Sequence, residues 1–440
     1  MKKEPVWLTD DTPVSHKLIR VVLFLTSFSW TFNPIQDYMG ESTPVEKIFT
    51  RMLPMLMVAA YCVFCEHRHR LRSVLHPFSW PILWYVTFGV FSGISSVQPA
   101  MCAWKGAEIL ILLMWVTVSC HDADSTRREF VSIARLVEIL LWVTVVLAIL
   151  NPTLGLRRSP SMIPWLQGYL PIINPNQVGF LSVAAFVRLI FLSARAKPVR
   201  LLLVLSTLVC SQSRTSYAVS LVVLVIFIID GLRERQYFRV SLASLAALAA
   251  LLLTMGHYET LVRILMRGQS EESLESLSGR TDYWNFALNY ATWFGGGLAT
   301  GSRSLILVTG QETFLRGSVN LHNSFVEALL GAGYVGALPY LAMVVIHTLR
   351  QGIAALTRPS LSQGLFLVMA LVFVARSMTS VVISLFSYDL MMLFIFWAWI
   401  RHDTPQAAPR RAQRPRPVVY DTPLCEMNRA QNPCQEGHSE

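Results

Sequence analysis

The chain has 440 residues, of which 53% are hydrophobic and only 15% are charged, and its mean hydropathy is +0.46. Soluble domains carry about 25% charged residues, so this composition excludes an ordinary soluble domain and predicts an all-α polytopic membrane protein. The net charge of +10 gathers in particular loops without a basic stripe of interleaved aromatic residues, which indicates membrane topology rather than nucleic-acid binding.

Twelve mostly apolar stretches have about the 20-residue length that a membrane span requires. We expect spans, in chain order, at residues 18–36, 46–65, 77–96, 103–120, 130–150, 177–194, 199–212, 215–231, 237–256, 333–349, 361–379 and 383–401. The pair at 199–212 and 215–231 is alternatively one helix that is broken between Ser211 and Arg214.

Basic residues alternate between the two sides of these spans. One side receives the most basic segments, which are Lys2-Lys3, 66–72, 127–128, 195–200, 233–239, 350–358 and the tail from 401. Basic loops stay in the cytoplasm, so we expect both termini there and the loops 151–176 and 257–332 on the outer face. The alternation holds through all twelve spans, which favours two separate helices within 199–231. No small-residue cleavage site follows the first residues, so we expect no cleaved signal peptide.

The chain is expected to consist of four parts. They are spans one to nine (1–256), a large outer loop with short helices (257–332), spans ten to twelve (333–402) and a disordered cytoplasmic tail (403–440). A loop as long as 257–332 is usually functional. Its segment Thr281–Leu288 has helical patterning, with Thr281 expected to cap the helix. The tail is rich in Pro, Gln and Arg and has no apolar periodicity.

His322 stands at the start of a short helix that closes the outer loop. The positive end of a helix disfavours imidazolium, so the ring is expected to be neutral and available as a base. The alternative is that His322 and Asn323 only cap the helix and satisfy its N–H groups. The glycines that follow, Gly331, Gly333 and Gly336, permit a tight bend and close helix packing.

Arginine is the only basic residue type, apart from histidine, between His257 and Leu321. Guanidinium groups bind phosphate oxygens in pairs and keep their charge when partly desolvated. Arg214, among serine and threonine at the mouth of two spans, and Arg280, beside a helix N-terminus, are therefore candidates for an anion site. The alternative for both is a snorkelling or surface-paired side chain.

Six further residues near the outer face are candidates for substrate binding: Arg157, Arg158, Lys105, Asn176, Asn323 and Asp389. Lys105 is alternatively the partner of Glu108 at i+3. Asp389 lies about two turns into the last span, where a carboxylate is costly and often functional. It is expected to orient a base or bind a sugar hydroxyl, or alternatively to make a helix-packing hydrogen bond. No paired carboxylates suited to a divalent ion occur in the outer loops, so we expect no metal and no cofactor.

Four stretches together resemble the O-antigen ligase and O-antigen polymerase-like family of bacterial envelope glycosyltransferases. They are Asn174-Pro175-Asn176-Gln177, Ser213-Arg214-Thr215, Ser278-Gly279-Arg280-Thr281-Asp282-Tyr283-Trp284 and His322-Asn323-Ser324. Their order, their outer placement and the long loop before His322 carry the resemblance, which covers roughly residues 150–400. The chain departs from many relatives at Ser216, where they have Gly or Ala after the Arg-Thr pair.

The resemblance implies a membrane-embedded glycosyltransferase of the C type (GT-C) in the bacterial inner membrane. The implied donor is a glycan on undecaprenyl pyrophosphate, and the implied acceptor is the lipid A–core oligosaccharide at the periplasmic face. His322 is then expected to activate the acceptor hydroxyl while Arg214 and Arg280 bind the pyrophosphate, in a metal-independent, inverting displacement. The alternatives are an O-antigen polymerase and a protein O-oligosaccharyltransferase. A transporter or flippase, from a different class, predicts internal symmetry and polar residues in mid-span, and the sequence shows neither.

Overall fold

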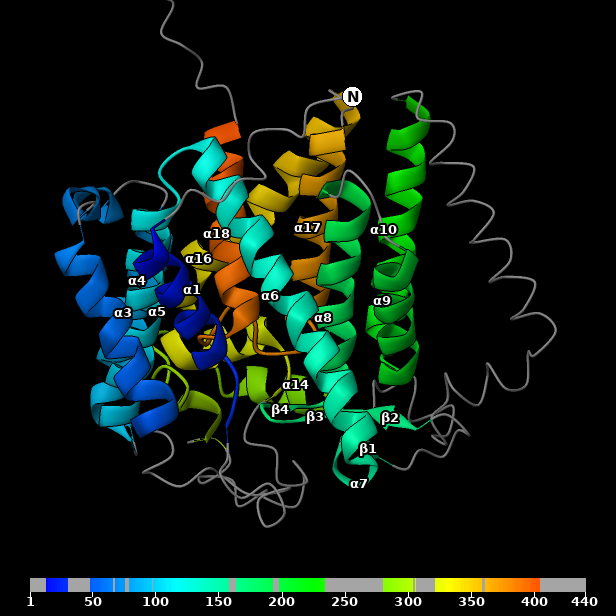
Figure 1. Cartoon of the computed structure of the whole chain (residues 1–440). Helices are drawn as coiled ribbons and strands as arrows, with labels where there is room; N and C mark the ends of the chain where they lie inside the picture. Colours follow the sequence, from blue (N-terminus) through cyan, green and yellow to red (C-terminus); the bar gives the residue numbers. More distant parts are fainter. Residues whose placement is uncertain are drawn as a thin grey trace, which may run out of the picture. The chain divides into compact units, whose positions relative to one another are not determined.

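In a computed structural model of the chain, the described residues are 13–30, 48–65, 68–75, 79–96, 98–157, 164–192, 198–233, 280–303, 305, 321–357 and 361–403. The predicted span 237–256, Arg158, most of the predicted outer loop and the predicted tail lie outside these residues. Within them the fold is helical, with strands only of two residues each (Figure 1).

The long elements are α1 (Val14–Thr26), α3 (Leu53–Phe64), α4 (Trp80–Ser92), α5 (Pro99–Ser119), α6 (Ala123–Leu150), α8 (Pro175–Val187), α9 (Pro198–Ser211), α10 (Arg214–Arg233), α14 (Arg280–Asn289), α16 (Ser324–Thr357), α17 (Leu361–Ser377) and α18 (Tyr388–Asp403). Short helices are η2 (Ile48–Met52), η3 (Arg68–Leu75), η4 (Gly93–Ser95), α7 (Pro152–Gly155) and η5 (Arg188–Leu192). Two small antiparallel sheets pair β1 (Leu156–Arg157) with β2 (Trp165–Leu166) and β3 (Gly168–Tyr169) with β4 (Ile172–Ile173).

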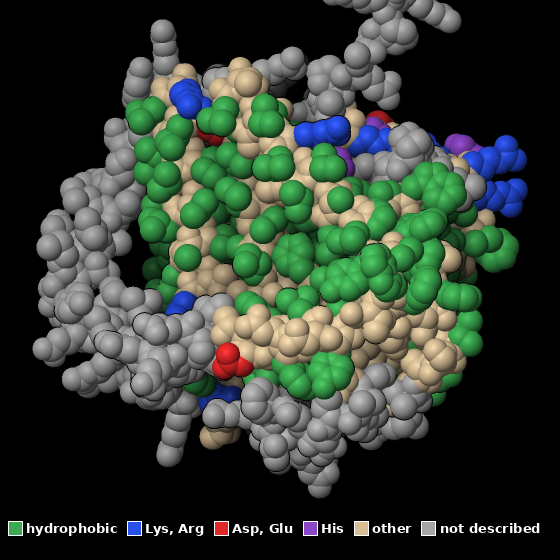
Figure 2. All heavy atoms as spheres, turned by 180° about the vertical axis from the view of Figure 1, so that it is seen from behind, with side chains coloured by type: hydrophobic (Ala, Val, Ile, Leu, Met, Phe, Trp, Pro, Cys, Tyr) green, Lys and Arg blue, Asp and Glu red, His purple; other side chains and the backbone are tan. Residues whose placement is uncertain are grey.

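Five stretches of the described helices are long and apolar enough to cross a membrane: Pro99–Ser119, Ala123–Leu150, Pro175–Leu192, Arg214–Arg233 and Ser324–Thr357. Large apolar side chains on these helices point outward, such as Ile149, which is 72% exposed, and Leu221, which is 61% exposed. Figure 2 shows one such face, where hydrophobic side chains cover the middle and Lys and Arg side chains gather towards one end. An apolar surface of this extent needs lipid around it, so the prediction of an all-α polytopic membrane protein is confirmed.

The boundary between α9 and α10 lies where the sequence suggested a break. α9 ends at Ser211 and α10 begins at Arg214. Gln212 in the turn has a left-handed backbone, with φ at 47°, and its side-chain oxygen accepts a hydrogen bond from Trp165 Nε1 at 2.6 Å. The stretch 199–231 therefore forms two helices, as expected.

Several expected boundaries are wrong. α1 ends at Thr26 rather than at residue 36, and α18 begins at Tyr388 rather than at residue 383, so Asp389 stands in its first turn and not about two turns into the span. Thr281 does not cap α14, because that helix already includes Arg280 and Thr281 lies in its first turn. The fifth predicted span begins at Ala123 rather than at residue 130, because Asp122 caps α6 by accepting the Ser125 N–H at 2.7 Å. The polar first turns of α6 carry the helix beyond its apolar stretch.

The glycines after His322 produce the bend that was expected of them. α16 bends at Gly333, which has φ at 68° and stands against the backbone of Trp293 and Gly295. A Cβ at Gly333 would lie 2.4 Å from Trp293 O, so no other residue fits there. The bend divides α16 into a short first part and a part of about 24 residues, which at about 1.5 Å per residue is long enough to span a bilayer.

α18 lies in the middle of the helix bundle (Figure 1). Every residue from Tyr388 to Ile400 is buried, as expected for a helix that is apolar on all sides. Tyr340 of α16 packs edge-on against Trp397 of α18 and stacks on Tyr85 of α4, with ring centroids 6.2 and 4.8 Å apart. Tyr340 Oη also donates to Ile383 O at 2.8 Å, which holds the segment just before α18, and with it Asp389, relative to α16.

Candidate active site

His322 lies just before α16 in a strained backbone conformation, with φ at 53°. Such a residue persists only where its surroundings hold it. Here both backbone groups of the preceding residue are held. Leu321 N donates to Glu327 Oε1 at 2.7 Å, and Leu321 O accepts from Trp284 Nε1 at 2.9 Å. Trp284 belongs to α14, so the same contact places Arg280, the first residue of α14, on the His322 side of the bundle.

Asn323 is the residue that caps α16. Its Oδ1 accepts the N–H groups of Phe325 and Val326 at 3.0 and 3.3 Å. The capping alternative therefore describes Asn323, and its side-chain oxygen serves the helix rather than pointing at a substrate. These two N–H groups do not need the imidazole of His322.

Two arginines from two helices, Arg280 of α14 and Arg376 of α17, act electrostatically on His322. Burial, and then the positive charges of Arg280 and Arg376, lower the pKa of His322 to about 4. At neutral pH the imidazole is therefore uncharged. The sequence predicted this neutrality from the helix dipole, whereas the structure attributes it to burial and two guanidinium groups.

Arg376, near the end of α17, is the residue of this cluster that the sequence analysis missed. Arg376 is buried, with 3% of the residue exposed. Its Nε lies 3.3 Å from Asp389 Oδ2, and its guanidinium carbon lies over the Phe180 ring, 4.1 Å from the ring centroid. Asp389 thus holds an arginine that in turn acts on His322. The sequence does contain one signal that could have revealed Arg376: it and Asp389 are opposite charges in two consecutive predicted spans that a short segment joins.

The segment between α17 and α18 is tied to the first residue of α16. Ser324 Oγ donates to Ser380 O at 2.6 Å and accepts the Val382 N–H at 2.5 Å. The segment thereby returns the chain to the start of α16. Because of this connection, Arg376 near the end of α17 and Asp389 at the start of α18 lie on the same side of the bundle as His322.

Arg214, the first residue of α10, is connected to Arg376 through α8. A Cβ at Gly179 of α8 would lie 2.6 Å from Ser216 Oγ, so α8 packs directly against the turn that carries Arg214. The next residue of α8 is Phe180, on which Arg376 stacks. Two consecutive residues of α8 therefore contact the Arg214 turn and the Arg376 side chain.

The first turn of α8 carries the predicted residue Asn176. Asn174 and Gln177 form a reciprocal cap there, with Gln177 N donating to Asn174 Oδ1 at 2.8 Å and Asn174 N donating to Gln177 Oε1 at 3.1 Å. The motif Asn174-Pro175-Asn176-Gln177 thus starts the helix that packs against the Arg214 turn. Asn176 lies in the first turn of that helix, beside this cap.

The remaining candidates lie in other surroundings. Arg157 is exposed in β1, and its guanidinium lies 5.6 Å from the Trp165 ring centroid. Lys105 pairs with Glu108 at 2.9 Å, which is the alternative the sequence allowed, and Arg51 Nη2 binds the same carboxylate at 3.0 Å. Among the described residues, no group of three or more His, Cys, Asp or Glu is placed to hold a metal ion.

Residues 199–341 match the family model described as O-antigen ligase. This range contains Arg214, Arg280 and His322, three of the residues on which the resemblance was based. No curated protein matches the chain. The resemblance to this family is thus confirmed: over residues 199–341 the chain carries the domain of the O-antigen ligase family.

Proposed function

We propose that the protein is an O-antigen ligase, which transfers a glycan from undecaprenyl pyrophosphate to the lipid A–core oligosaccharide at the periplasmic face of the bacterial inner membrane. The family domain supports a glycosyltransferase of the ligase or polymerase type. The observation that most supports a transfer site here is that burial and the positive charges of Arg280 and Arg376 lower the pKa of His322, so its half-buried imidazole is neutral and available as a base.

The reaction in this proposal is a single displacement. His322 takes the proton of the acceptor hydroxyl while that oxygen forms the new bond to the anomeric carbon. The bond from that carbon to the pyrophosphate oxygen breaks, and the pyrophosphate leaves with the electron pair. The guanidinium groups of Arg214, Arg280 and Arg376 neutralise the charge that develops on it. Because no covalent enzyme intermediate forms, the anomeric configuration inverts.

Arg376 is a new member of the proposed cationic set, and Asp389 is its positioning residue. The ion pair with Asp389 and the stack on Phe180 hold the guanidinium in one orientation, so it needs no reorganisation when the donor binds. Arg157, Arg158, Lys105 and Asn176 remain candidates for contacts to the glycan chains, whereas Asn323 is assigned to the cap of α16. Of these, Lys105 is already paired with the Glu108 carboxylate, which Arg51 also binds, so its ammonium group is the least available to a glycan.

The glycans of a deletion strain test the proposed function. Loss of a ligase leaves long polymer on the lipid carrier and lipopolysaccharide with core only, and we expect this result. An O-antigen polymerase uses the same carrier, but its loss leaves single repeat units attached to the core, and that result would contradict the proposal. Normal lipopolysaccharide in the strain would favour a protein O-oligosaccharyltransferase.

Cysteine labelling is expected to place α14 outside and the start of α6 inside. In a background without the native cysteines, an impermeant maleimide applied to intact spheroplasts should label Asn289→Cys but not Asp124→Cys. Both positions are exposed in the structure, so a difference between them reports the side of the membrane rather than burial. Labelling of Asp124→Cys in intact cells would overturn the orientation, and labelling of both after lysis is the control.

The pH dependence of transfer is expected to lack an acid limb near the ordinary histidine pKa of about 6.5. Because the pKa of His322 is lowered to about 4, the ring stays a competent base as the pH falls, and kcat/KM should hold from pH 8 to about 5.5. Arg280→Gln removes one positive charge and should move the acid limb to higher pH. A bound pyrophosphate neutralises the positive charges of Arg280 and Arg376, which raises the pKa of His322 in the complex. The acid limb of kcat should therefore lie at higher pH than the acid limb of kcat/KM. A limb near pH 6.5 in both proteins would contradict this electrostatic account.

Transfer by the purified protein is expected to survive excess EDTA. The arginines supply the counter-charge that a divalent ion provides in other transferases. The one acidic pair in the sequence of the predicted outer loop, Glu271-Glu272, lies in an acidic run that we interpret as a solvated face. The initial rate before and after chelation is the measurement. Loss of activity that added Mg²⁺ or Mn²⁺ restores would contradict metal-independent transfer and would make Asp389 and the region around Glu271 candidate metal ligands.

A further inference from the structure

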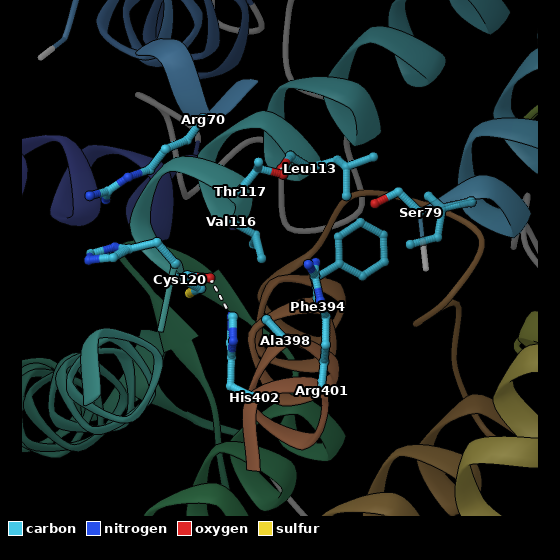
Figure 3. A pocket seen from close by; sticks show the side chains of 12 residues that line it. Arg70, Ser79, Leu113, Val116, Thr117, Cys120, Phe394, Ala398, Arg401 and His402 are labelled. Carbon is cyan, nitrogen blue, oxygen red and sulfur yellow. Dashed lines mark hydrogen bonds between the residues drawn. The ribbon is translucent and has the colours of Figure 1, made fainter. Parts of the chain in front are cut away.

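A cavity of about 380 Å³ lies at the opposite end of α18 from the candidate active site. Asp389 stands at the first turn of α18 and Arg401 in its last, so about 12 residues, or roughly 18 Å of helix, separate the two sites. The cavity is bordered by η3, α4, α5 and α18 (Figure 3). Its size is within the range of small-molecule sites, which is about 300–1,000 Å³.

The charged residues of the cavity are all basic. The described residues that line it include Arg70, His121, Arg401 and His402, and none of those residues is Asp or Glu. His402 Nε2 is bonded to Cys120 O at 3.0 Å, which Figure 3 shows as a dashed line, and His121 Nε2 pairs with Asp122 Oδ2 at 2.9 Å. Both histidines are thus engaged with the protein.

Arg401 differs from these histidines. None of the ion pairs or hydrogen bonds formed among the described residues involves its guanidinium, and Glu129 in neighbouring α6 is already paired with Arg20 at 2.8 Å. Figure 3 shows the Arg401 side chain lying along Phe394 rather than leaving the cavity. A guanidinium held in a cavity without a carboxylate is suited to an anionic ligand.

The other wall of the cavity is apolar and includes Ile82, Leu113, Val116, Phe394 and Ala398. Ser79 and Thr117 contribute hydroxyl groups between the two kinds of wall. Directly after Ser79, the indole of Trp80 is 54% exposed. An exposed tryptophan at the end of an apolar helix marks the level of the lipid headgroups. The cavity therefore combines cations at headgroup level with an apolar wall of buried side chains from α4, α5 and α18.

We propose that this cavity binds the phosphate-bearing headgroup of an anionic glycerophospholipid, with Arg401 as the main contact and an acyl chain along Phe394. Basic pockets between membrane helices are suited to such headgroups. With the orientation expected from the basic loops, the lipid belongs to the cytoplasmic leaflet. Free phosphate has the same anionic chemistry but makes no use of the apolar wall, so the two sources are distinguishable.

Thermal unfolding of the full-length protein in neutral detergent tests this site. We expect phosphatidylglycerol to raise the Tm of the wild type, because a ligand that binds only the folded state stabilises it. Equal concentrations of phosphatidylcholine or of inorganic phosphate should give little or no shift. Arg401→Gln should reduce the phosphatidylglycerol shift to about half or less, in line with about tenfold weaker binding. The matched control is Arg350→Gln, which removes an exposed arginine from α16 outside the cavity and should retain the full shift.

Three results would overturn the proposal: a full shift in Arg401→Gln, an equal shift from phosphatidylcholine, or an equal shift from inorganic phosphate. If Arg401→Gln does not fold, Arg401→Lys replaces it, because lysine keeps the charge but lacks the planar fork. An unchanged phosphatidylglycerol shift in Arg401→Lys would then count against the site, and a reduced shift would support it.

Discussion

Replacing His322 by asparagine is expected to lower the rate of glycan transfer by a factor of about 10²–10⁴, the usual contribution of a positioned general base. Asparagine tolerates the left-handed backbone at this position, where φ is 53°, and it carries no basic nitrogen. The variant should therefore fold, insert and bind the donor. His322→Ala should lose activity to the same extent but adds backbone strain, so the asparagine variant is the cleaner test.

Single-turnover transfer and donor binding, measured on the same preparation, separate the roles of His322. The matched control is His347→Ala, which removes a histidine that lies further along α16 beside Trp397 and should leave transfer near normal. Near-normal turnover in His322→Asn would reduce His322 to a loop residue whose neutrality has no catalytic use.

Replacing Arg280 or Arg214 by lysine is expected to lower transfer by roughly 10- to 100-fold, the cost of one lost charge-assisted contact in the transition state. Lysine keeps the charge but cannot reproduce the planar fork that grips two phosphate oxygens. Arg376→Lys should fall at least as far, because it also loses the stack on Phe180 and weakens the pair with Asp389.

The control for these substitutions is Arg303→Lys. Arg303 comes from the same outer segment, but its guanidinium donates to Gln98 Oε1 at 3.2 Å and has no place in the proposed site. Normal activity in Arg280→Lys, Arg214→Lys and Arg376→Lys alike would mean that these arginines serve folding or topology. Asp389→Asn should shift the acid limb of the pH profile, since it frees Arg376 to move relative to His322.

Much of the helical framework could be predicted from the sequence because apolar length and breaker residues are local signals. The break at Ser211–Arg214 and the bend at Gly333 are visible in the residues themselves. Boundaries failed where polar residues extend a helix past its apolar stretch, as at Asp122 before α6. The structure agrees with a polytopic membrane fold, while the total of twelve spans and the GT-C type remain predictions.

The site was predictable only where each residue carries its own local signal. His322 and Arg280 stand at helix starts beside a long polar loop, and that placement is readable in one dimension. Arg376 was not predictable in this way, because its role depends on the return of the α17–α18 segment to Ser324. The cause of the neutral imidazole was missed for the same reason, since it arises from two arginines that are distant in sequence.

Reconstituted transfer tests the central claim most directly. The purified protein, in liposomes that contain undecaprenyl-pyrophosphate-linked glycan and lipid A–core, is followed by mass spectrometry of the lipid products. The proposed mechanism predicts core-linked glycan with an inverted linkage from the wild type and none above background from His322→Asn. Glycan that grows on the carrier without transfer to the core, or transfer that His322→Asn retains, would contradict it.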